Sequence, residues 1–159
     1  MTIKYVTDDL VQMAQDGKFD VIAHGCNCGH CMSAGIALSI AKTWPEALAV
    51  DKLTPHFDPG KMGKISVANV KNNAGGDLAI VNAYTQFDWK GKGGYPLVDY
   101  KSVKTCLRIM KHKFTGQRIG LPLIGAGLAG GDWEIIELII EKELQGEDVT
   151  VVKWIGDVS

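Results

Sequence analysis

The hydrophobic residues of this chain fall into short continuous runs, separated by longer segments in which apolar positions recur every three or four residues. Short runs rich in Val and Ile predict buried strands, and the longer periodic segments predict amphipathic helices. The predicted strands cover residues 3–6, 19–24, 65–70, 78–84, 117–124 and 149–155. The predicted helices cover residues 9–16, 35–42, 46–52, 99–113 and 133–144. An Asn- and Gly-rich turn joins the third strand to the fourth and predicts a hairpin.

Strands that alternate with helices, together with one hairpin, predict an α/β fold with a mixed central sheet covered on both faces. The chain of 159 residues is expected to form one domain, residues 1–159, which is long enough to bury roughly 70% of its unfolded surface. Ligands of such folds bind beyond the carboxyl ends of the strands. This rule brings together the loop at 25–34, the loop after Tyr84 and the segment after Leu123.

The segment at 120–133 is an apolar run that breaks into glycines and then opens into a predicted helix. Glycine lets a ligand approach the backbone closely, and the free N–H groups of a helix N-terminus attract anions. The spacing Gly125-x-Gly127-x-x-Gly130 also matches the dinucleotide-binding fingerprint, but that motif normally lies in an early strand-helix unit, and here only one predicted strand follows. We therefore expect a diphosphate-binding loop of another α/β fold, with a purely structural tight turn as the alternative.

The 17 basic and 18 acidic residues nearly cancel, so no overall field favours nucleic acid or an anionic membrane. A small, partly anionic ligand fits this balance better. No apolar run approaches the about 20 residues of a membrane span, and the first residues enter a strand pattern without the layout of a signal peptide. These features predict a cytoplasmic protein with no nucleic-acid or membrane partner.

Three of the four cysteines crowd into Cys26-x-Cys28-x-x-Cys31, flanked by His24 and His30. This cluster raises the alternative of a zinc-containing interaction domain. A structural zinc site usually takes its second pair of ligands from a knuckle about 12 or more residues away, and the one remaining cysteine lies within a predicted helix. We therefore expect no metal, and interpret the cysteines as small, half-buried side chains.

Several segments taken together resemble one known family. They are Asp9 after the first strand, residues 24–27 with 33–37 behind them, residues 82–86, and residues 121–133. In combination they resemble a macro domain, and more narrowly the branch of small stand-alone macro domains, phage-encoded members included, that hydrolyse ADP-ribose 1″-phosphate. The resemblance covers essentially the whole chain, and it implies a three-layer α/β/α fold with a mixed central sheet.

The resemblance also implies an ADP-ribose pocket. Asp9 takes the place of the acid that recognises the adenine amino group, although its usual glycine predecessor is Asp8 here; the alternative is an ordinary helix N-cap. Asn27 is expected to contact the distal ribose, and the alternative is a turn asparagine. The residues expected to line the diphosphate are Gly35, Ile36, Ala37, Gly125, Ala126, Gly127, Leu128 and Ala129.

For hydrolysis, the polar residues expected to converge on the distal phosphate are His24, Asn27 and Asp132. Asp132 could equally serve only as a helix N-cap, and His24 only as a hydrogen-bonded histidine at a strand end. No carboxylate cluster for paired metals is evident, and no cofactor is expected. General acid-base catalysis raises the rate of a reaction by about 10²–10⁴-fold. Because the uncatalysed hydrolysis of a phosphate monoester is among the slowest reactions known, we expect slow turnover.

The resemblance thus implies a phosphatase of ADP-ribose 1″-phosphate, with two alternatives: a non-catalytic ADP-ribose reader, and a hydrolase that removes ADP-ribose from its esters. A sister branch that acts on such esters uses a lysine and an aspartate, and the corresponding positions carry Ala41 and Ala129. The expected partners are ADP-ribose or ADP-ribose 1″-phosphate, with an ADP-ribosylated protein as a further candidate. The expected location is the cytoplasm, that of the host if the chain is phage-encoded.

Overall fold

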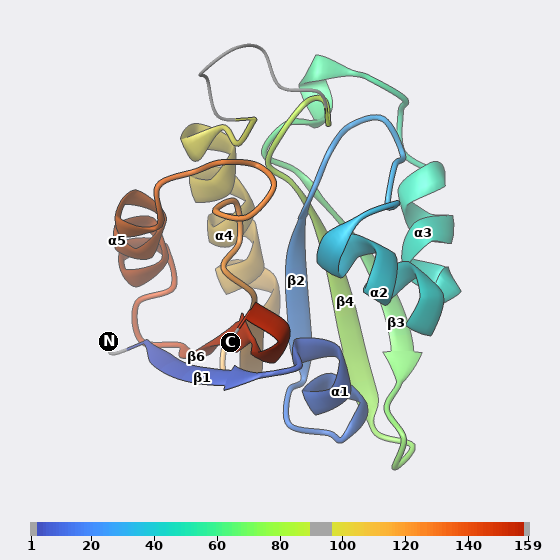
Figure 1. The fold of residues 1–159 in the computed structure, drawn as a ribbon, viewed down its shortest axis with the longest axis vertical. Helices are drawn as coiled ribbons and strands as arrows, with labels where there is room; N and C mark the ends of the chain where they lie inside the picture. Colours follow the sequence, from blue (N-terminus) through green and yellow to red (C-terminus); the bar gives the residue numbers. More distant parts are fainter. Residues whose placement is uncertain (1–2, 90–96, 158–159) are drawn as a thin grey trace.

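The computed structural model describes residues 3–89 and 97–157, which build a six-stranded mixed sheet between two layers of helices (Figure 1). The strands are β1 (Lys4–Asp8), β2 (Val21–Cys26), β3 (Ile65–Lys71), β4 (Asp77–Tyr84), β5 (Arg118–Leu121) and β6 (Asp148–Trp154). The helices are α1 (Leu10–Gln15), α2 (Gly35–Thr43), α3 (Pro45–Lys52), α4 (Tyr100–Phe114) and α5 (Trp133–Glu143), with short 3₁₀ turns η1 (Pro59–Lys61) and η2 (Ile155–Asp157). The predicted three-layer α/β/α fold with a mixed central sheet is confirmed.

The strand order is β1-β6-β5-β2-β4-β3, and every neighbouring pair is parallel except β3 and β4. The antiparallel pair is the predicted hairpin, and Asn72 closes its turn by accepting hydrogen bonds from the N–H groups of Ala74 and Gly76. Because five strands run the same way, their carboxyl ends share one edge of the sheet. The loops that carry the candidate chemistry all leave from that edge.

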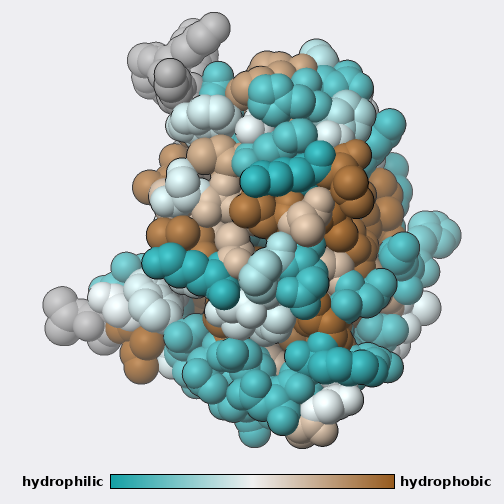
Figure 2. All heavy atoms as spheres, turned by 90° about the vertical axis from the view of Figure 1, so that its right-hand side faces the viewer, coloured by the Kyte–Doolittle hydropathy of each residue, from teal (hydrophilic) through white to brown (hydrophobic). Residues whose placement is uncertain are grey.

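Successive residues of β2 pack on opposite faces of the sheet, as strand geometry requires. Val21 and Ala23 belong to a core cluster with residues of α4 and α5, whereas Ile22 belongs to a second cluster with residues of α1, α2 and α3. The side of the molecule where α3 lies shows apolar side chains gathered in its middle, above a polar lower part (Figure 2). No helix among the described residues is long and apolar enough to span a bilayer.

Aspartate side chains start three of the helices. The carboxylates of Asp9, Asp99 and Asp132 each accept a hydrogen bond from an N–H group in the first turn of α1, α4 and α5, respectively. Such caps satisfy N–H groups that have no partner within the helix. They explain why the sequence places these helix starts within a residue or two of their observed positions.

Most strand boundaries differ from the predicted ones by one or two residues, and the end of β5 differs by three. Strand β5 ends at Leu121, three residues early, because Pro122 has no N–H group for the ladder and its carbonyl instead accepts from Ile124 in a tight turn. Strand β2 continues to Cys26, which lies in register with Tyr84. Residues 90–96 of the segment after Tyr84 lie outside the described residues, and the segment between α3 and β3 contains η1.

Candidate functional site

Three loops meet at the carboxyl edge of the sheet. A methyl group added at Gly25 would lie 2.7 Å from Thr85 Oγ1, after β4, and 3.6 Å from Ile124, after β5. A methyl group added at Gly35, the first residue of α2, would lie 3.6 Å from Leu128. The start of α2 and the loop at 122–132, hereafter the glycine loop, therefore stand next to each other, as the sequence predicts.

Hydrogen bonds between its own backbone groups hold the glycine loop in shape. Gly125 has a φ of +76°, and its carbonyl accepts the N–H of Gly131 at 2.7 Å. The N–H of Gly130 donates to the carbonyl of Gly127 at 3.0 Å. Within the described part of the chain, the N–H groups of residues 127–129 have no hydrogen-bond partner, and Leu128 is 78% exposed. Consecutive unpartnered N–H groups in a glycine-rich turn form a concave surface that suits an anion.

The N-terminus of α2 offers a second set of free N–H groups. Its N-cap is Ala34, which has no side-chain oxygen to satisfy them, and Gly35 has a φ of +57°. Gly35 is exposed, and Ile36 and Ala37 are half-buried. Because the positive end of the helix dipole adds to these N–H groups, this terminus also favours an anion. The two anion-favouring surfaces are neighbours, because the Leu128 side chain lies close to the backbone of Gly35.

Asp132 closes the glycine loop and is exposed. Its Oδ1 accepts the N–H of Glu134 at 2.9 Å as the cap of α5, and its own N–H donates to the Tyr100 hydroxyl at 2.9 Å. The capping role is therefore real. A carboxylate has capacity for further hydrogen bonds beyond one cap, so the cap leaves Asp132 able to contact a ligand or a water molecule.

His24 lies inside the protein with no exposed surface. Its Nε2 is 2.7 Å from Asn82 Oδ1, and the Asn82 amide donates to the Ala47 carbonyl and to Ser66 Oγ. Burial lowers the pKa of His24, so that the neutral ring is the stable form at neutral pH. The position and partners of His24 favour the alternative of a hydrogen-bonded core histidine over direct contact with a ligand.

Asn27 lies at the start of the loop after β2 and is buried. Its Oδ1 accepts the N–H groups of Gly29 and Cys31 at 2.9 and 3.3 Å, and its amide donates to the Cys31 carbonyl at 2.9 Å. The side chain therefore holds the loop in shape. Because a carboxamide carries two N–H donors, one remains for a ligand hydroxyl.

Asp9 follows β1 and is half-buried. Its carboxylate accepts the N–H of Gln12 at 3.1 Å, and its own N–H donates to Asp8 Oδ1 at 2.7 Å. Asp8 is in register with Trp154, which is exposed at the end of β6. Asp9 thus combines a cap of α1 with a place at the same edge of the sheet as the other loops.

Thr85 is a candidate that the sequence did not single out for a role. Its hydroxyl is the one buried side-chain oxygen or nitrogen without a hydrogen-bond partner among the described residues. The hydroxyl lies where the loops after β2, β4 and β5 meet, as its distance from Gly25 indicates. A buried unsatisfied hydroxyl costs free energy, and a bound water or ligand group relieves that cost.

The cysteines do not gather around a common point. Cys26 Sγ is 3.5 Å from His24, Cys28 Sγ is 3.6 Å from Met62 Sδ, and Cys31 Sγ is 3.0 Å from Ser33 Oγ. Burial raises the pKa of Cys26 and of Cys28, so both remain thiols at neutral pH. In residues 3–89 and 97–157, no group of three or more His, Cys, Asp or Glu side chains could hold a metal ion.

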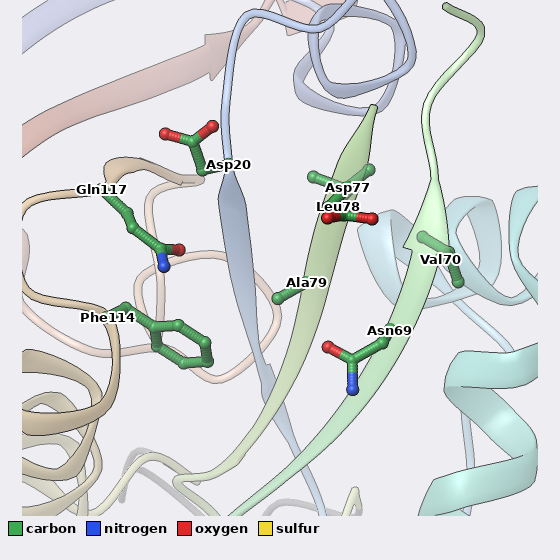
Figure 3. A pocket seen from close by; sticks show the side chains of 8 residues that line it. All are labelled: Asp20, Asn69, Val70, Asp77, Leu78, Ala79, Phe114 and Gln117. Carbon is green, nitrogen blue, oxygen red and sulfur yellow. The ribbon is translucent and has the colours of Figure 1, made fainter. Parts of the chain in front are cut away.

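A hollow of about 570 Å³ lies at the opposite edge of the sheet, where β2, β4 and β5 begin. Phe114 and Gln117 form one side of it, and Asn69 and Asp77 the other (Figure 3). Its two carboxylates are both in ion pairs, Asp20 with Arg118 and Asp77 with Lys71. The hollow therefore contains no unpaired charged group that marks it as a reactive centre.

The chain is similar to several known proteins and solved structures, although no family model matches it. The chain is 33% identical over 159 residues to an uncharacterized 17.5 kDa protein of Enterobacteria phage T4, and the match covers 97% of each. It is 26% identical over 150 residues to an ADP-ribose 1″-phosphate phosphatase of Lodderomyces elongisporus, with 89% of this chain and 92% of that protein covered.

Among solved structures, a macrodomain protein of Streptomyces coelicolor superposes with a TM-score of 0.71 and is 26% identical. That match covers 95% of this chain and 98% of the other. The chain that carries the six-stranded sheet and the glycine loop is thus similar over 95% of its length to a macrodomain. This protein belongs to the macrodomain family.

Proposed function

We propose that this protein binds ADP-ribose at the carboxyl edge of its sheet and hydrolyses ADP-ribose 1″-phosphate to ADP-ribose and inorganic phosphate. The main support is the pair of anion-favouring surfaces, the N-terminus of α2 and residues 127–129, which are neighbours because the Leu128 side chain lies close to Gly35. Two adjacent sets of unpartnered N–H groups suit the two phosphates of a diphosphate. The similarity to the Lodderomyces phosphatase supports the choice of substrate.

In this proposal the adenine lies toward Asp9 and the exposed Trp154, at the end of β1 and β6. The diphosphate lies between α2 and the glycine loop. The distal ribose lies near Asn27, whose remaining N–H donates to a ribose hydroxyl. Because Asn27 also fixes the shape of its own loop, its contribution is mainly to positioning.

In this hydrolysis the oxygen of water bonds to phosphorus and becomes part of the inorganic phosphate. The bond from phosphorus to the C1″ oxygen breaks, and that leaving oxygen gains a proton. Asp132 is the exposed carboxylate at the end of the glycine loop, and we assign it the transfer of this proton, directly or through a water molecule. His24 is fully buried, and in this account it acts through its hydrogen bond to Asn82 as a positioning residue for β2 and the loop that follows.

The chemistry of such a site predicts slow turnover. One general acid-base group contributes about 10²–10⁴-fold, whereas uncatalysed hydrolysis of a phosphate monoester is among the slowest reactions known. The hemiacetal oxygen at C1″ is a better leaving group than a simple alcohol, which eases the demand. A turnover number above about 100 s⁻¹ would contradict this account.

The test is the release of inorganic phosphate from ADP-ribose 1″-phosphate by chelator-treated protein, with two variants of Asp132. Asp132→Asn keeps an N-cap oxygen and removes the acid-base function, so we expect release to slow by about 10²–10⁴-fold with unchanged stability. Asp132→Ala also removes the cap, at a cost of about 1 kcal/mol of unfolding free energy. Equal activity of Asp132→Asn and the unaltered protein would contradict the role of Asp132.

The same pocket supports a second candidate, a non-catalytic reader of ADP-ribose. It would bind ADP-ribose and release no phosphate from the 1″-phosphate. A third candidate, cleavage of ADP-ribose esters on proteins, lacks two groups used by the sister branch, because the positions carry Ala41 and Ala129. Incubation with an ADP-ribosylated protein, followed by detection of free ADP-ribose, distinguishes it from the phosphatase.

A further inference from the structure

An exposed group of rings stands beside the loop after β2. The aromatic cluster consists of Phe57, Phe87 and Trp89, together with His30 and His56. The Phe57 and Trp89 rings are stacked, with centroids 5.6 Å apart and planes 29° apart, and Phe57 is 5.4 Å from Phe87. His56 lies 4.6 Å from Phe57 and 5.0 Å from His30. Trp89 is 43% exposed and Phe87 39%, so the cluster presents ring surface to solvent.

The backbone ties the cluster to the loop that carries Asn27. The N–H of Phe57 donates to the Cys28 carbonyl at 2.7 Å, and the N–H of Cys28 donates to the Phe87 carbonyl at 2.9 Å. The Trp89 and Phe57 rings pack on Gly29 so closely that a methyl group there would lie 2.5 Å from Phe57 Cζ. The N–H of Gly29 in turn donates to Asn27 Oδ1. The rings therefore lie against Gly29, which is hydrogen-bonded to Asn27, the residue proposed to contact the distal ribose.

Two residues of the cluster have an unfavourable backbone conformation. His30 has a φ of +58° and Phe57 a φ of +49°, and they are the two non-glycine residues with positive φ among the described residues. Such a conformation is unfavourable for a residue with a bulky side chain, and residues of this kind cluster at functional sites. A hydrogen bond from the His30 ring to the Thr54 carbonyl, 2.8 Å long, helps to hold it. Strain together with exposed rings distinguishes this surface from ordinary packing.

We propose that the aromatic cluster binds a heteroaromatic ring attached at C1″ of ADP-ribose, so that the site accepts a dinucleotide such as NAD⁺. The inference rests on the proposed ADP-ribose site, whose distal ribose directs C1″ toward the loop of Asn27. Flat rings stack on exposed aromatic side chains irrespective of their exact substituents. A dinucleotide fits better than a nucleic-acid strand, because 17 basic against 18 acidic residues provide no excess positive charge for a polyanion.

The test is calorimetric titration of NAD⁺ and of ADP-ribose into three proteins: the unaltered chain, Trp89→Leu, and Leu138→Ala as a control at an exposed apolar residue of α5. We expect NAD⁺ to bind the unaltered chain about 5- to 100-fold more tightly than ADP-ribose, the range that one stacked ring contributes. Trp89→Leu should remove this preference and leave the affinity for ADP-ribose within about twofold. Phe87→Leu, a second exposed position, should reduce the preference in the same direction.

Equal affinity for the two ligands in the unaltered chain, or an equal loss of both in Trp89→Leu, would overturn the inference. Tight binding of a short single-stranded oligonucleotide that depends on Trp89 would also overturn it, because the rings would then serve nucleic acid. Failure of ADP-ribose itself to bind would instead contradict the proposed function. The two failures are therefore distinguishable in one set of titrations.

Discussion

The glycine loop provides a sharp test, because two of its glycines differ in their surroundings. A methyl group at Gly131 would lie 2.5 Å from the Gly125 carbonyl oxygen and 2.7 Å from a Val98 methyl, whereas a methyl group at Gly127 meets nothing within 4 Å. In Gly131→Ala the Gly125 carbonyl must move, and the 2.7 Å hydrogen bond from the Gly131 N–H is lost or stretched. Overpacking costs about 1–3 kcal/mol and the hydrogen bond about 0.5–1.5 kcal/mol.

We therefore expect Gly131→Ala to lower the free energy of unfolding by about 2–4 kcal/mol, and Gly127→Ala to change it by less than about 0.5 kcal/mol. Urea denaturation of the two variants and the unaltered protein measures both values. Both variants should weaken ADP-ribose binding, Gly131→Ala by displacing N–H groups and Gly127→Ala by placing a methyl group where the ligand lies. A Gly131→Ala protein as stable as the original would refute the packing on which this reasoning depends.

Three further predictions concern buried polar groups. Burial lowers the pKa of His24, so on acidification the unfolded chain binds a proton there, near its usual pKa of about 6.5, before the folded protein does. The unfolding free energy should therefore fall below that pH by up to about 1.4 kcal/mol per pH unit, and His24→Gln should show a shallower dependence in denaturation at pH 5 to 7. An identical slope in both proteins would mean that His24 titrates normally. Thr85→Val replaces a buried hydroxyl that has no partner by a methyl group, so thermal unfolding should show stability that is unchanged or raised by about 1 kcal/mol. Calorimetry should show weaker ADP-ribose binding. A clear loss of stability would mean that the hydroxyl has a partner inside the protein. Lys61 is buried and donates from Nζ to the carbonyls of Pro55 and Cys28. Lys61→Met should therefore lower the free energy of unfolding by about 1–3 kcal/mol in denaturation, and it should weaken ADP-ribose binding in titration because the loop at Cys28 loses this support. Unchanged affinity would exclude this coupling.

The layers of the fold could be predicted because they depend on local patterns. Apolar runs, periodic segments and capping aspartates such as Asp9 and Asp132 act over a few residues, and the helices begin where these residues allow. The antiparallel hairpin followed from its turn residues. The early end of β5 was missed because the apolar pattern continues past Pro122, although proline cannot complete the ladder.

The surroundings of the candidate site could be predicted only in part. The glycine loop could be predicted from the sequence, because its glycines and the helical pattern that follows them are visible there. The burial of His24 depends on its register with Asn82 of the neighbouring strand, and no local pattern reveals which residues of two parallel strands face each other. A polar Asn82 within an apolar strand was the available signal that a buried partner exists.

The aromatic cluster was also beyond the sequence, because its members come from three loops separated by more than twenty residues. Only the fold brings Phe57 and Phe87 to the two sides of Cys28. The same holds for Thr85, whose isolation appears only when the loops around it are in place. Long-range packing, and not residue type, decides these features.

The central claim is that the N-terminus of α2 and the glycine loop together bind the diphosphate of ADP-ribose. Calorimetric titration of ADP-ribose into the unaltered protein, repeated with Gly131→Ala, tests it most directly. The account predicts one ADP-ribose per chain with a dissociation constant in the micromolar range, and clearly weaker binding by the variant. No heat of binding with the unaltered protein, or equal affinity in the variant, would contradict it.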